Sequence, residues 1–320
     1  MPSALTLDPD AERVIALIRA AERPRWETLS PADARIAYAA NRTVLQPDPP
    51  PIAEVRDLAA PGPVGRVPLR LYRPADAPSP APVVMFFHGG GWVLGDLDSH
   101  DGVCRALAIA AGAVVIAVDY RLAPEHIFPA AIEDSAAAVA WTAREAGALG
   151  LDPARIALVG DSAGGNLAAV VALMARDGAL PVRPVLQGLI YPATDLVMNH
   201  ASHARPLEDV PLTPTTMRWF GELYCPRPAD RLDWRASPLR AANLAGAAPA
   251  FVLTVGHDPL RDEGIEYARR LEREGVRVTH VDIADQIHGF LTMGRFMRVA
   301  ADTTAMLGAA LRREFTPAPL

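Results

Sequence analysis

Short apolar segments recur along the chain and alternate with segments that favour helices. The apolar runs are rich in β-branched residues: VVMFFHGGG, AVVIAVDY, RIALVGDSAG, VLQGLIYP, AFVLTVGHD and VRVTHVDI. Helix-like segments lie between them, among them GVCRALAIAAG, AAIEDSAAAVAWTAREAG and GGNLAAVVALMARDG. Runs that are apolar throughout are typical of strands buried on both faces, and their alternation with helices is typical of a parallel sheet. We therefore predict an α/β fold, with a mostly parallel central sheet flanked by helices.

Two further segments lie outside this alternation and predict helices that cover the sheet. Near the N-terminus, Asp8 before Pro9 and Ser30 before Pro31 are typical helix starts. Residues 194–234 are too long for a simple connection between two strands. Within them, Thr213 and Pro214 are placed to begin a helix, with an apolar face formed by Met217, Phe220 and Tyr224. We expect the two segments to form one cap.

The division of the chain follows from these segments. The proline-rich PDPPP at 47–51 cannot be helical and indicates a connector. After it, IAEVRDLAA and GRVPLRLYRP, joined through PGPVG, predict an antiparallel hairpin. We expect one structural unit in four parts: 1–46 as the N-terminal part of the cap, 47–196 as the first part of the main domain, 197–232 as the cap insertion and 233–320 as the second part of the main domain.

Composition narrows the classes of function. The net charge of -6 and the isoelectric point near 5.8 provide no basic surface for nucleic acid. All basic residues are arginine, which excludes a P-loop lysine and a lysine Schiff base. Cys104 and Cys225 are too few and too far apart for a disulfide framework or a metal site. We see no signal peptide and no run long enough to span a membrane, so we expect a cytoplasmic protein.

The segment LVGDSAGGNLAA contains the first candidate for chemistry, Ser162 between Gly160 and Gly164. A strand-like run precedes it and a helix-like run follows, which is the setting of a nucleophile elbow. The alternative is a glycine-rich turn that only packs a helix onto a strand. A serine hydroxyl needs a base before it becomes a good nucleophile, and the base is a histidine oriented by a carboxylate.

The base and the acid are expected after the later strands. His288 follows the last strand-like run, whereas His280 belongs to that run. His257 is a further candidate base. Asp258 follows the strand AFVLTVG directly, which makes it the preferred acid.

Other nearby ionisable residues remain less favoured. Asp262 and Glu263 are alternative acids, or else part of a solvated helix start. His200 and His203 are alternative bases, but we expect both to be surface residues of the insertion.

The glycine-rich HGGGW at 88–92 follows another strand-like run. Its glycines let the backbone approach a ligand closely and present several N–H groups to an oxyanion. The dinucleotide fingerprint does not fit, because neither the glycine spacing nor a following helix is present. HGGG upstream of G-x-S-x-G is the combination found in lipases and esterases.

With these motifs the chain resembles the hormone-sensitive-lipase-like, or bacterial family IV, carboxylesterases of the α/β-hydrolase fold. HGGGW, YRLAPEHIFPAAIED, GDSAGGNLA, SPL, DPLRDEG and HGF stand in the order of that family and span 88–290. The resemblance implies Ser162 as the nucleophile, Asp258 as the orienting acid and His288 as the base. It also implies a small ester as substrate, with short or medium acyl chains, and no metal or organic cofactor. Members of the family are often homodimers.

The resemblance also implies roles for residues around the triad. The oxyanion hole is expected from the backbone N–H groups of Gly89, Gly90 and Ala163. His88 is expected to stiffen the glycine loop, and Glu125 to be a supporting polar residue. Met217, Trp219 and Phe220 of the insertion are candidates to line the pocket, but we expect at least two of the three to pack the cap on the body instead. Trp92, next to the glycines, is expected to border the pocket.

Three alternatives stay open at this point. Relatives of that family include a plant gibberellin receptor, which binds its ligand and in which the catalytic histidine is replaced. Other plant relatives are dehydratases. Amide hydrolysis by the same triad is the third alternative.

Overall fold

A single sheet of eight strands organises the structure, a computed structural model that describes residues 6–22, 24–205, 207 and 210–316. The order of strands across the sheet is β1-β2-β4-β3-β5-β6-β7-β8. Only the pairs β1–β2 and β2–β4 are antiparallel. The strands are β1 Glu54–Pro61, β2 Arg66–Arg73, β3 Ala81–Phe87, β4 Val114–Val118, β5 Leu151–Asp161, β6 Leu186–Ile190, β7 Ala250–His257 and β8 Val278–Ile287. The predicted hairpin and the mostly parallel sheet are confirmed.

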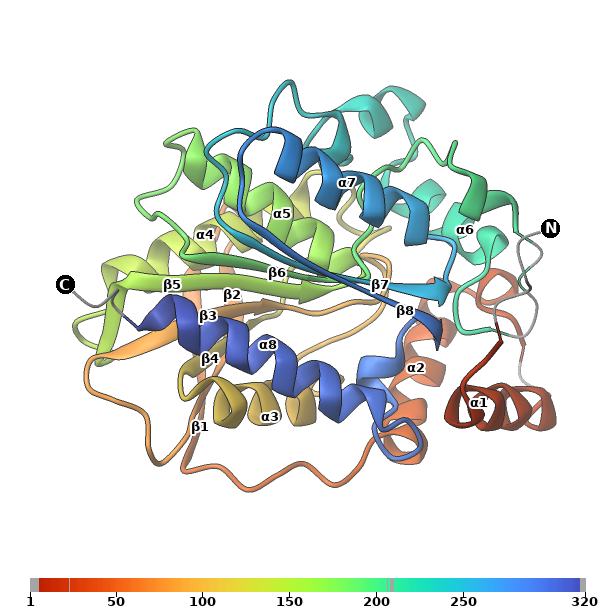
Figure 1. Ribbon diagram of the computed structural model, residues 1–320, viewed down its shortest axis with the longest axis horizontal. Helices are drawn as coiled ribbons and strands as arrows, with labels where there is room; N and C mark the ends of the chain where they lie inside the picture. The colour runs from red at the N-terminus through yellow and green to blue at the C-terminus, as the bar shows by residue number, and fades with distance from the viewer. Residues whose placement is uncertain (1–5, 23, 206, 208–209, 317–320) are drawn as a thin grey trace.

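Helices cover both faces of this sheet (Figure 1). On one face lie α3 Asp101–Ala111 and α8 Val299–Phe315; on the other lie α4 Ala130–Arg144, α5 Ala163–Arg176 and α7 Arg261–Arg273. Every residue of β3 and of β4 is buried, as expected of central strands that are apolar along their whole length. Cys104 of α3 is buried in the core.

The cap elements gather at the edge of the sheet where the parallel strands end (Figure 1). They comprise α1 Pro9–Ala20, η1 Trp26–Thr28, α2 Pro31–Leu45, η2 Ala201–Ala204, α6 Pro214–Tyr224 and η3 Pro228–Leu232; the remaining short turns are η4 Pro238–Arg240 and η5 Phe290–Thr292. The side chains of Asp8, Ser30 and Thr213 each accept a backbone N–H at the start of their helices. The helix starts were therefore predicted correctly. The predicted parts 1–46, 197–232 and 233–320 include residues 1–5, 23, 206, 208–209 and 317–320, which lie outside the described residues.

Across the described residues, none of the helices is long and apolar enough to span a membrane.

Candidate active site

Ser162 stands on a tight turn between β5 and α5. Its backbone has φ 56° and ψ −118°, a conformation that L-residues rarely adopt. A Cβ on Gly160 would lie 2.2 Å from the carbonyl oxygen of Gly164, and one on Gly164 would lie 1.9 Å from that of Phe87. Both glycines of the motif are therefore required for the backbone segments to pass so closely. The strained backbone of Ser162 favours a nucleophile elbow over a glycine-rich turn that only packs a helix onto a strand.

His288 lies between the other two predicted triad residues. Its Nε2 is 2.9 Å from Ser162 Oγ, and its Nδ1 is 2.7 Å from Asp258 Oδ2. Asp258 is fully buried, and its other oxygen accepts the N–H of Leu260 at 2.8 Å. The ring of Tyr191 packs against the imidazole, with 4.5 Å between ring centroids. The structure thus brings Ser162, His288 and Asp258 into one hydrogen-bonded line, as a serine nucleophile with its base and orienting acid requires.

The other candidate bases lie elsewhere. His280 is in β8, where its Nε2 contacts the hydroxyl of Thr254 at 3.0 Å. His257 ends β7 and is only partly buried. His200 is half-buried, and His203 is buried with its Nε2 2.7 Å from Glu263. The prediction that both insertion histidines are surface residues is wrong for His203, because the insertion turns inward and docks on α7.

Neither of the two alternative acids, Asp262 and Glu263, takes the place of Asp258 beside His288. Asp262 accepts the N–H of Ser202 at 2.8 Å and is not in contact with His288. Glu263 is fully buried, which contradicts its interpretation as part of a solvated helix start.

The glycine loop after β3 corrects the predicted oxyanion hole. The N–H of Gly89 donates to Asp161 Oδ1 at 2.9 Å, and Gly89 does not border the pocket. In contrast, Gly90, Gly91 and Ala163 line the pocket beside Ser162, and within the described part of the chain their N–H groups have no hydrogen-bond partner. The Gly89 N–H group is thus already bonded, which contradicts its predicted role, whereas Gly91 becomes a candidate donor. The sequence does not show this, because the pairing of Gly160 with Phe87 across β3 and β5, which brings the Asp161 carboxylate beside Gly89, is seen only in the structure.

His88 is held beneath this loop. Its Nδ1 donates to the carbonyl of Gly89 at 2.8 Å, and its ring stacks on Tyr120 at 4.3 Å between centroids. The hydroxyl of Tyr120 donates to the carbonyl of His88 at 2.7 Å. Burial and the neighbouring His100 lower the pKa of His88 to about 4, so the ring is neutral at neutral pH. These contacts fit the stiffening role expected for this residue.

Glu125 lies outside the pocket and anchors the cap. Its carboxylate accepts two hydrogen bonds from Arg35 of α2, at 2.9 and 2.6 Å. Arg35 also donates to the carbonyls of Val93 and Ala123, at 2.9 and 2.8 Å. The bonds from Arg35 lower the pKa of Glu125 to about 2. Glu125 is thus a supporting residue that fastens the N-terminal helices to the loops around the site.

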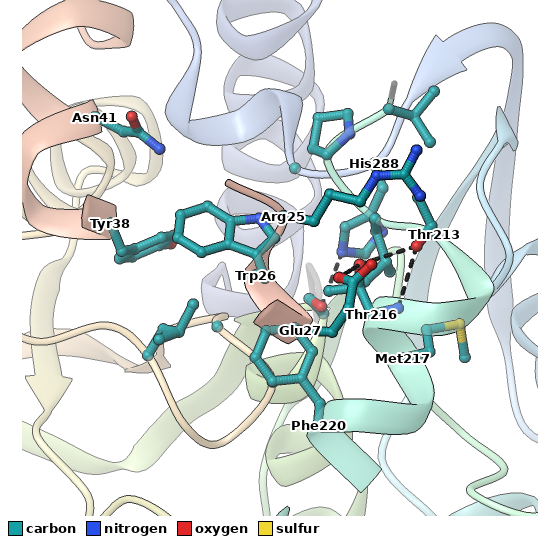
Figure 2. A pocket seen from close by; sticks show the side chains of 18 of the residues that line it. Arg25, Trp26, Glu27, Tyr38, Asn41, Thr213, Thr216, Met217, Phe220 and His288 are labelled. Carbon is teal, nitrogen blue, oxygen red and sulfur yellow. Dashed lines mark hydrogen bonds between the residues drawn. The ribbon is translucent and has the colours of Figure 1, made fainter. Parts of the chain in front are cut away.

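A cavity of about 880 Å³ opens onto Ser162 and His288. Figure 2 shows Trp26 and Tyr38 from the N-terminal segment on one side and Met217 and Phe220 of α6 on the other. Trp92 also lines it. Trp219 does not, and packs instead on Phe220 with 5.0 Å between ring centroids. Both parts of the cap therefore shape the space in front of the nucleophile.

Across the described residues, no group of three or more histidine, cysteine or acidic side chains is arranged to hold a metal ion.

Known proteins resemble this chain over most of its length. A family model described as the alpha/beta hydrolase fold matches residues 84–292. A carboxylic ester hydrolase of Mycobacterium tuberculosis is 44% identical over 271 residues, which cover 83% of this chain and 72% of the relative. An ethyl acetate hydrolase of Pseudomonas putida is 43% identical, covering 77% of this chain and 78% of the relative.

Solved structures resemble the whole fold. A hyperthermophilic esterase from the archaeon Pyrobaculum calidifontis superimposes with a TM-score of 0.90 at 39% identity, covering 96% of this chain and 98% of that one. An alpha/beta hydrolase enzyme from the metagenome of Lake Arreo, Spain, has a TM-score of 0.93 at 41% identity, covering 97% and 99% of the two chains.

Proposed function

The chain belongs to the hormone-sensitive-lipase-like family of α/β hydrolases, and we propose that it hydrolyses carboxylic esters through Ser162, His288 and Asp258. Relatives that share most of its length are carboxylic ester hydrolases, and this chain is an ester hydrolase as well. The single observation that supports the assignment of residues is the line of two short hydrogen bonds from Ser162 Oγ through His288 to Asp258.

Each residue of this line has one task. His288 Nε2 accepts the proton of Ser162 Oγ as the oxygen attacks the ester carbonyl. Asp258 accepts a hydrogen bond from the Nδ1–H group of His288, which leaves Nε2 free as the base and stabilises the imidazolium that forms. The imidazolium then protonates the leaving alcohol, and the same histidine activates water to hydrolyse the acyl-enzyme.

The negative charge of the tetrahedral intermediate is proposed to meet the N–H groups of Gly90, Gly91 and Ala163. Gly90, Gly91 and Ala163 line the same pocket as Ser162, and Ala163 begins α5. A helix N-terminus adds partial positive charge at the same place. Preorganised donors of this kind stabilise charge without any rearrangement of solvent.

The substrates proposed are esters of short or medium acyl chains. The apolar side chains of Trp26, Met217 and Phe220 border the cavity, which suits an acyl chain. A homodimer and a cytoplasmic location are part of the same proposal; sedimentation of the purified chain and fractionation of producing cells test them.

The test is steady-state hydrolysis of p-nitrophenyl esters from acetate to palmitate, with Ser162→Ala beside the wild type. We expect a maximum at short or medium chains and nearly complete loss in the variant. A folded wild type that hydrolyses no ester would contradict the proposal and favour ligand binding or dehydration. Mass spectrometry of the products separates gain of water from loss of water, and matched p-nitroanilides report amide hydrolysis.

A further inference from the structure

Glu263 is a fully buried carboxylate that the proposed mechanism does not use. It lies in the first turn of α7, five positions after Asp258. Burial raises the pKa of Glu263, because a carboxylate loses its hydration inside the protein. A buried acid of this kind costs stability unless donors surround it. The groups that contact it therefore indicate what it holds.

One carboxylate oxygen of Glu263 binds the segment that follows β6. Its Oε1 accepts the backbone N–H groups of Thr194 and, at 3.0 Å, Asp195. The neighbouring residue of that segment, Ala193, donates its N–H to the carbonyl of Ser162 at 3.2 Å. Glu263 is thus connected through a short stretch of backbone to the turn that carries the nucleophile.

The other oxygen binds the cap insertion. Oε2 lies 2.7 Å from His203 Nε2 in η2. His203 Nδ1 accepts the N–H of His200 at 3.2 Å, which places the ring proton on Nε2, where it is donated to Glu263. All three contacts of the Glu263 carboxylate are thus donors.

The same turn of the insertion also contacts the loop of the triad acid. Ser202 Oγ donates to the carbonyl of Pro259 at 2.6 Å, and the N–H of Ser202 donates to Asp262 at 2.8 Å. Pro259 directly follows Asp258. Three segments therefore meet at Glu263: the backbone behind the nucleophile, the loop of the acid and the base of the cap insertion.

We propose that Glu263, together with His203, is a positioning residue that holds the Asp258 loop in register with the Ser162 turn. Ser162 follows β5 and Asp258 follows β7, so the strand between them, β6, separates the two sides of the triad. Among the residues that the structure describes, only His288 hydrogen-bonds to the side chains of both. Displacements of the order of 1 Å between reacting groups are costly to rates, so a fixed distance between the two loops matters for turnover. This inference rests on the proposed function.

The experiment compares Glu263→Gln with Glu314→Gln. Glu314 also accepts charged hydrogen bonds, from Arg277 at 2.9 Å and Arg313 at 3.0 Å, but it lies near the end of α8, at the opposite edge of the sheet from the cap (Figure 1). Each protein is assayed for kcat and KM with p-nitrophenyl butyrate, for the rate of phosphorylation of Ser162 by diethyl p-nitrophenyl phosphate, and for Tm. The phosphorylation reports the arrangement of the triad without acyl-enzyme turnover.

We expect Glu263→Gln to lower kcat and the phosphorylation rate together, about tenfold or more, with KM changed less than threefold. Glu314→Gln is expected to keep all three constants within twofold of the wild type. A second pair keeps the test decisive if Glu263→Gln does not fold. His203→Gln retains an N–H donor near the position of Nε2 and should keep most activity, whereas His203→Leu should lose it as Glu263→Gln does.

A purely structural role predicts a different result. If Glu263→Gln and His203→Leu lower Tm but keep kcat and the phosphorylation rate within twofold at a temperature where both are folded, the inference is overturned. A wild type that neither hydrolyses the ester nor reacts with the phosphate would instead overturn the proposed function, and with it this inference. An active wild type with unaffected variants overturns the inference alone.

Discussion

Phe220 of α6 lies directly against Gly91 of the glycine loop. A Cβ built on Gly91 would come within 2.2 Å of Cγ of the Phe220 ring, and Gly91 has φ 62°. The insertion therefore presses on the backbone that is proposed to supply an oxyanion donor. Gly91 is required here both for its left-handed backbone and for the space that the ring fills.

We expect Gly91→Ala to lower kcat/KM at least about a hundredfold, the scale of losing one oxyanion donor. The added methyl must displace either the loop or the ring. The double variant Gly91→Ala, Phe220→Ala should recover part of this loss, because truncation of the ring removes the clash. Steady-state kinetics on p-nitrophenyl butyrate measure both.

Phe220→Ala alone is the control for this pair. It enlarges the cavity and should move the acyl-chain optimum toward longer esters, with little loss of kcat on the best substrate. If the double variant were no more active than Gly91→Ala, contact with Phe220 would not be the reason that residue 91 must be glycine.

A hydrogen bond between Glu27 and Thr216 joins the two parts of the cap. Thr216 Oγ1 donates to the Glu27 carboxylate at 3.0 Å, across 189 positions of sequence (Figure 2). Bonds to charged groups contribute about 1.5–3 kcal/mol. We expect Thr216→Val to raise KM about fivefold with a smaller change in kcat, and to speed hydrogen exchange of residues 26–29. Thr215→Val, one position earlier, removes a hydroxyl that accepts a hydrogen bond from Arg218 and does not bond to Glu27, so it should do neither.

Arg35 fastens α2 to the loops below it with four hydrogen bonds. Arg35→Met should lower the free energy of unfolding by about 2 kcal/mol in urea titrations, since two carbonyls and a carboxylate lose their donor. Glu125→Gln should cost much less, because the Glu125 side chain is 55% exposed and surface ion pairs contribute little. Equal losses in the two variants would mean that the ion pair, and not the bonds to Val93 and Ala123, holds the helix.

Much of the architecture could be predicted from local pattern. The central strands are apolar on both faces, and Asp8, Ser30 and Thr213 begin their helices as capping residues do. Ser162, Asp258 and His288 could be proposed because each follows a recognisable strand, and parallel strands bring their carboxyl ends to one edge. Such features depend on a few adjacent residues, which is why the sequence contains them.

The errors concern contacts between distant segments. Three consecutive glycines offer three N–H groups, and only the position of Asp161 decides that the first is already bonded. The sequence indicates that His203 is a polar loop residue, and only the folded structure shows its hydrogen bond to the buried Glu263. Trp219 and Phe220 are adjacent, yet only the orientation of α6 decides which of them lines the cavity. None of these choices leaves a periodic signal in the sequence.

Asp119, directly after β4, is expected to make the free energy of unfolding depend on pH. Burial and the carboxylate of Asp96 raise the pKa of Asp119 from 3.8 to about 6. The native state therefore binds more protons than the unfolded state between about pH 4 and pH 6, and the free energy of unfolding falls as pH rises through that range. Asp119→Asn removes this loss, so it should stabilise the protein at pH 8 by up to about 3 kcal/mol and have little effect at pH 4. Asp57→Asn is the opposite control, because the hydrogen bond from Arg70 lowers the pKa of Asp57, so the destabilisation by this substitution should be larger at pH 8 than in acid, where Asp57 takes up a proton. Urea titrations between pH 4 and pH 8 measure the free energy of unfolding of both variants. If Asp119→Asn raised this free energy equally at pH 4 and pH 8, the buried charge of Asp119 would not be the cause of the stabilisation.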